Sequence, residues 1–82
     1  MEIKLDGLGR LTTEHAASSY GQPVLVLDDE SGAVGPGDLL WRERGIMPAG
    51  MLVRVWLREH GADLTDEERE CAEGFAGMPL GQ

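Results

Sequence analysis

The 82-residue chain carries 15 acidic and seven basic side chains, which leave it at net charge −8. Its length predicts one domain with a small core, and its 41% hydrophobic content excludes a disordered chain. The acidic excess argues against binding to anionic membranes and against direct binding to nucleic acid, because both would repel this protein.

The charges are arranged in blocks. Residues 1–40 have a net charge of −5, residues 41–60 of +2 and residues 61–82 of −5. The single cysteine, Cys71, cannot form an internal disulfide, and the chain begins with a charged, strand-like stretch. These features predict a cytoplasmic protein without a signal peptide.

The first third of the chain has the pattern of a small sheet. Residues 2–5 alternate polar and apolar side chains, which predicts a half-buried strand. After a break at residues 6–9, Thr12 or Thr13 is suited to cap a short helix that ends near Gly21.

The next segment predicts a central strand and a turn. Residues 24–27 (Val-Leu-Val-Leu) are apolar on both faces, as in a strand inside a sheet. Residues 28–32 form a turn, and residues 33–34 return as a short edge strand.

The second half is predicted to be helical. Asp38 is suited to cap a helical turn over residues 39–44, which Gly45 ends. Pro48 then begins a helix that runs to about His60, with Gly61 as its C-cap.

The sequence also predicts where the last helix begins. Thr65 and Glu68 have the spacing of a capping box, which opens a helix to about Phe75. The expected fold is therefore α+β, with a small antiparallel sheet and a short helix followed by a C-terminal helical hairpin. Residues 1–37 form the sheet half of a single domain (1–82), residues 38–77 the helical half and residues 78–82 a loose tail.

The helix over residues 48–60 is apolar around most of its circumference, with Arg54 and Arg58 as its only polar stripe. Two interpretations follow: it is the central helix of the domain, or one flank meets a second protein. In the second case the chain forms a homodimer through Met51, Leu52 and Val55.

An acidic row is predicted on the last helix, opposite its apolar face of Leu64, Cys71, Ala72 and Phe75. The row consists of Asp66, Glu67, Glu70 and Glu73. It spans about 10 Å of helix, or one charge per roughly 3.5 Å, close to the spacing of about 3.4 Å along a DNA strand. A second patch would come from Asp28, Asp29 and Glu30. The alternative is an ordinary solvated helix face.

No catalytic or metal-binding motif is present. His15, His60 and Cys71 lack paired ligand spacing, and the glycine-rich residues 32–37 lack the Lys-Ser/Thr of a phosphate-binding loop. We therefore expect no enzymatic activity, no cofactor and no bound metal.

The sequence thus favours a non-catalytic acidic module that binds a basic protein surface. Such a module would act as an inhibitor or nucleic-acid mimic in the basic groove of a nucleic-acid-binding partner. The analogy, by size and charge alone, is with anti-CRISPR proteins and other inhibitors carried by phages and mobile elements. The alternative is a small helix-turn-helix transcriptional regulator or antitoxin that uses Arg42, Arg44, Arg54 and Arg58.

Overall fold

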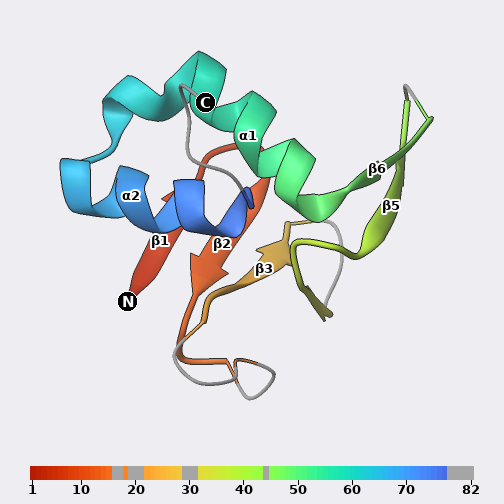
Figure 1. Cartoon of the computed structure of the whole chain (residues 1–82), viewed down its shortest axis with the longest axis horizontal. Coiled ribbons are helices and arrows are strands. Elements are labelled where there is room, and N and C mark those ends of the chain that lie inside the picture. Colours follow the sequence, from red (N-terminus) through yellow and green to blue (C-terminus); the bar gives the residue numbers. More distant parts are fainter. Residues whose placement is uncertain (16–17, 19–21, 29–31, 44, 78–82) are drawn as a thin grey trace.

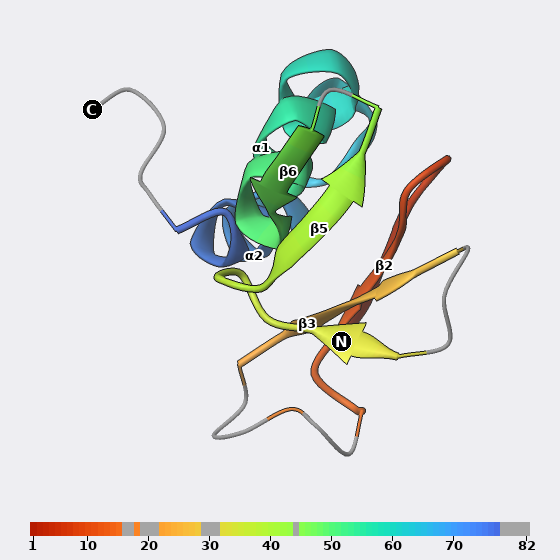
Figure 2. The same ribbon diagram turned by 90° about the vertical axis from the view of Figure 1, so that its right-hand side faces the viewer.

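The structure, a computed structural model, describes residues 1–15, 18, 22–28, 32–43 and 45–77. The strands are β1 (Glu2–Leu5), β2 (Gly9–Thr12), β3 (Val24–Leu27), β4 (Ala33–Val34), β5 (Leu39–Arg42) and β6 (Gly45–Pro48). The helices are α1 (Ala49–His60), the 3₁₀ turn η1 (Gly61–Asp63) and α2 (Asp66–Phe75). This is the expected α+β class, with the two α-helices over one face of the main sheet (Figures 1 and 2).

The main sheet is an antiparallel meander in the order β1-β2-β3-β4. Ile3 pairs with Leu11 and Leu11 pairs with Leu25, so these fully buried side chains share one face. On the opposite face, Val24 and Val26 are also buried. The strand predictions for residues 2–5, 24–27 and 33–34 are confirmed, and β3 lies inside the sheet as expected.

Strand β2 was not predicted from the sequence. The expected helix start at Thr12 or Thr13 is wrong, because residues 13–15 are not helical. The Thr12 hydroxyl instead accepts a hydrogen bond from the Glu14 amide at 3.0 Å, which shapes a turn at the end of the strand. The rest of the predicted helix includes residues 16–17 and 19–21, which lie outside the described residues.

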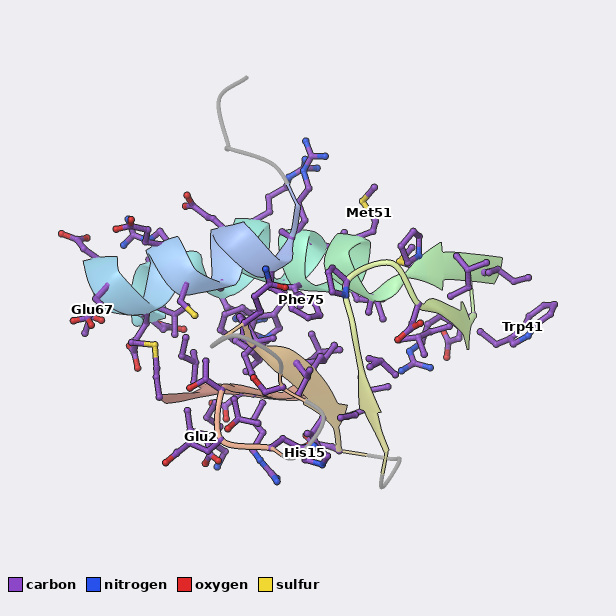
Figure 3. All side chains as sticks on the ribbon, turned by 60° about the horizontal axis from the view of Figure 1, so that its bottom comes forward. Glu2, His15, Trp41, Met51, Glu67 and Phe75 are labelled. Atoms are coloured by element: carbon purple, nitrogen blue, oxygen red, sulfur yellow. The ribbon has the colours of Figure 1, made fainter. Side chains whose placement is uncertain are left out.

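The C-terminal helical hairpin is confirmed: α1 and α2 are antiparallel and joined by η1 (Figure 1). Phe75 points from α2 toward the sheet (Figure 3), where it is buried in one core with Val53 and Trp56 of α1. Gly61 occupies the C-cap of α1, but its φ of −60° is right-handed and the chain continues into η1. No described helix combines the length and hydropathy needed to cross a bilayer.

The segment before α1 differs from the prediction. The helical turn expected over residues 39–44 is wrong: β5 and β6 pair as a separate two-stranded sheet. Asp38 does not cap a helix there, because its carboxylate accepts a hydrogen bond from the Gly35 amide at 2.7 Å. The half predicted to be entirely helical therefore begins with a β-hairpin.

Backbone contacts explain how this hairpin is joined to α1. The amides at the start of a helix lack partners within the helix. Ala49 donates to the Asp38 carbonyl at 2.8 Å and Gly50 to the Pro36 carbonyl at 2.9 Å. A Cβ atom on Gly50 would lie 3.2 Å from both the Pro36 and Phe75 carbonyl oxygens. Glycine thus allows the loop before β5 and the end of α2 to approach α1 closely.

Candidate functional site

The start of α2 has the predicted capping box. The Thr65 hydroxyl accepts from the Glu68 amide at 3.1 Å, and the Glu68 carboxylate accepts from the Thr65 amide at 3.0 Å. Glu68 therefore has a structural role, and the remaining acids of this helix are the ones available for contacts.

The acidic row on α2 is largely exposed. Asp66, Glu67 and Glu70 are exposed and Glu73 is half-buried, while the opposite face of the helix is buried in the core. Arg69 lies 3.7 Å from Asp66, but an ion pair between exposed side chains contributes little. In the part of the chain that the structure describes, no ion pair involves the other three members.

The second predicted acidic patch does not extend this row. Asp28 is exposed and follows β3, where its amide donates to the Leu8 carbonyl at 3.1 Å. In Figure 1 the first turn of α2 lies at the far left, whereas β3 ends near the middle of the molecule. Asp29 and Glu30 lie outside the described residues.

The predicted dimer flank on α1 is partly exposed. Met51 and Val55 are 40% and 43% exposed, whereas Leu52 is half-buried and packs against the core. The helix is therefore covered on one side by the domain core and retains an uncovered apolar strip. The central-helix interpretation therefore holds in part, and the homodimer through this flank stays a prediction.

The hairpin has a wholly apolar face that sequence reasoning missed. Leu39 pairs with Pro48 and Trp41 pairs with Ile46, so these four side chains share one face, called here the outer face. Leu39, Trp41 and Ile46 are 65%, 76% and 50% exposed. On the inner face, Leu40 is buried and belongs to the domain core. The signal for this hairpin was a pair of short apolar runs, residues 39–41 and 46–48, separated by three charged residues and Gly45.

A groove of about 620 Å³ lies between the hairpin, α1 and the β1–β2 turn. Its apolar lining comes from Leu8, Met47, Leu52, Val55 and Trp56, and its charged or ionisable lining from Asp6, Arg42, Glu43, Glu59 and His60. No serine, cysteine or lysine is among the described lining residues. The groove thus offers apolar contact and several charges, with no hydroxyl, thiol or amine side chain among its described lining residues.

The described residues provide little other chemistry. They contain no cluster of three His, Cys, Asp or Glu side chains able to hold a metal ion. Burial raises the pKa of the Cys71 thiol, which lowers the reactive thiolate fraction. The rings of His60 and Trp56 are tilted at 38° to each other, with 5.2 Å between their centroids.

The arginine block does not have helix-turn-helix geometry. Arg42 lies on β5, where its guanidinium donates to the Trp41 carbonyl at 2.7 Å. Arg54 and Arg58 lie on α1, and Arg44 is outside the described residues. The segment that would supply the helix before the recognition helix is a β-hairpin, so the described residues do not form a helix-turn-helix. The regulator or antitoxin alternative itself stays a prediction.

No protein-family model matches this chain, and comparison with curated proteins and with solved structures found no significant match.

Proposed function

We propose that this chain is a non-catalytic protein-binding module that recognises a basic surface of a partner protein. The observation that carries the proposal is the acidic row, three of whose four carboxylates are exposed. Ala72 and Phe75, on the other side of α2, are 0% and 3% exposed. The helix backbone is therefore anchored before binding, so only the exposed acidic side chains, and not the helix itself, have to be ordered by a partner.

Electrostatics supports a basic partner. The chain has net charge −8, which favours encounter with a positive surface and discriminates against acidic ones. In the described part of the chain, the only ion pair made by the row is the one between Asp66 and Arg69. Most of its charge therefore remains available to a partner.

The finer proposal is that the row occupies a nucleic-acid-binding groove and acts there as an inhibitor in the cytoplasm. The axial charge spacing of roughly 3.5 Å resembles that of phosphates along a strand. Because Asp28 lies elsewhere, the mimicry is confined to about 10 Å of one helix. The contact would then replace only a few phosphates, and additional apolar contacts would have to supply affinity.

A pair of charge-matched variants tests the proposal. Glu67→Lys with Glu70→Lys changes the net charge from −8 to −4, and so does the control, Glu14→Lys with Asp28→Lys. All four wild-type side chains are exposed, so both variants should melt close to wild type. A partner is captured from host lysate with wild type, identified by mass and purified. Its affinity for all three proteins is then measured across a salt series.

We expect the variant in the row to bind much more weakly, the control to bind nearly as wild type, and wild-type binding to weaken as salt rises. Equal binding by all three proteins would mean that the row serves only solubility. Equal loss in both variants would mean that net charge, not the row, matters.

Wild type should also fail to shift duplex DNA in a gel near physiological salt; a shift would favour the regulator hypothesis.

A further inference from the structure

Of the six large hydrophobic side chains that are exposed among the described residues, three (Leu39, Trp41 and Ile46) lie on the outer face of the β5–β6 hairpin. Trp41 points away from the body of the molecule at one end (Figure 3), and it is 76% exposed. A two-stranded hairpin is only marginally stable without cover, and exposed apolar patches commonly mark interaction sites. We propose that the outer face packs against the same face of a second copy of this chain, forming a two-fold symmetric dimer.

The size of the outer face suits a weak dimer. The solvent-exposed apolar area of the outer face is on the order of 300 Å², summed over Leu39, Trp41 and Ile46 at their observed exposures. That is the scale of the largest functional patches on monomers. Two copies would bury roughly twice this area, below the approximately 1,200 Å² of stable standard interfaces. Self-association should therefore appear in the micromolar range, not at nanomolar concentrations.

Charge argues for a second copy as the occupant. The outer face carries no ionisable side chain, so a basic partner has nothing there to pair with. Residues 39–48 contain Arg42, Glu43 and Arg44, a net of +1 in a chain of net −8. Two copies of so acidic a protein therefore repel each other less when they meet at this segment than when they meet at one of the two acidic blocks.

The position of the hairpin reduces the repulsion further. The hairpin and the first turn of α2 lie at opposite ends of the longest axis of the molecule, which measures 30 Å (Figure 1). In Figure 3, Trp41 and Glu67 likewise lie at opposite ends. In a dimer joined by the hairpins, the two acidic rows would be several Debye lengths apart, each about 8–10 Å at moderate salt. Both rows would remain free, so the dimer is compatible with the proposed function and independent of it.

This interface differs from the flank expected on α1. The outer face carries three exposed apolar side chains on an element that extends from the body (Figure 1), whereas Met51 and Val55 on α1 are less exposed. A symmetric interface requires one patch that complements itself, and a face made of leucine, tryptophan, isoleucine and proline does so without matching charges.

Sedimentation of the full chain from low to high micromolar concentration tests the proposal. The variants on the outer face are Trp41→Glu and Ile46→Lys. The control, Met51→Glu, adds the same negative charge as Trp41→Glu but places it on the α1 flank. Melting followed by circular dichroism checks that each variant is folded. We expect wild type and Met51→Glu to dimerise with rising concentration and both hairpin variants to remain monomeric.

A wild-type measurement covers the case in which the hairpin variants do not fold. Trp56 is 9% exposed, so quenching of the fluorescence by iodide reports mainly Trp41, and the quenching should decrease as the dimer forms. A wild type that stays monomeric with unchanged quenching would overturn the proposal. So would a dimer that Met51→Glu dissociates and Trp41→Glu does not. A monomer whose capture of a partner is abolished by Trp41→Glu would assign the outer face to another protein instead.

Discussion

The two tryptophans of this chain should respond oppositely to truncation, and Trp56 provides the sharpest test of the core. Trp56 lies on α1 and is 9% exposed. Its indole N–H donates to the Asp6 carbonyl at 2.9 Å, which links the helix to the β1–β2 turn. Trp56→Ala removes both the buried ring and this link.

The expected loss is large for a domain of this size. Replacing a buried tryptophan by alanine costs about 3–5 kcal/mol. The free energy of unfolding of globular proteins is about 0.05–0.15 kcal/mol per residue, which gives about 4–12 kcal/mol for a chain of this length. Trp56→Phe keeps most of the ring and loses the hydrogen bond, worth about 0.5–1.5 kcal/mol. The loss for phenylalanine should therefore be less than half the loss for alanine.

Urea unfolding followed by far-ultraviolet circular dichroism measures these free energies by linear extrapolation. The matched control is Trp41→Ala, which should change stability by less than about 0.5 kcal/mol because its ring is exposed. The measurement is made at low micromolar concentration, where self-association contributes least. A loss below about 1.5 kcal/mol for Trp56→Ala, or an equal loss at Trp41, would refute the assignment of Trp56 to the core.

Three further outcomes follow from the structure. Gly9→Ala should lower the free energy of unfolding by more than about 2 kcal/mol, because the new Cβ would lie 2.2 Å from the Val26 carbonyl oxygen; a melting temperature near wild type would contradict this packing. Thr65→Ala should cost about 1 kcal/mol through loss of the cap, measured by urea unfolding. Cys71 should be alkylated more slowly in the folded than in the unfolded chain, because burial raises its pKa. The Cys71 thiol therefore loses its proton at a lower pH in the unfolded chain than in the folded chain. Its contribution to the free energy of unfolding should fall as the pH rises through the pKa of the unfolded chain.

Local patterns in the sequence were sufficient for much of the fold. Strand β1 follows from alternation, β3 from a run that is apolar on both faces, and α2 from a capping box with one apolar face. The exposure of Asp66, Glu67 and Glu70 follows from the same helical periodicity. These features depend on residues close together in the chain, and a pattern can therefore specify them.

Long-range contacts decided the rest. Residues 39–44 are too few for their periodicity to separate a helical turn from a strand. Residues 39–42 form β5 because Leu40 reaches the core while the carbonyls of Pro36 and Asp38 accept hydrogen bonds from the first amides of α1. The separation of Asp28 from the acidic row likewise follows from the sheet order and not from the sequence. The exposure of Trp41 is also decided by tertiary structure. One face of the hairpin packs against other elements, and the opposite face, which carries Trp41, is left in solvent.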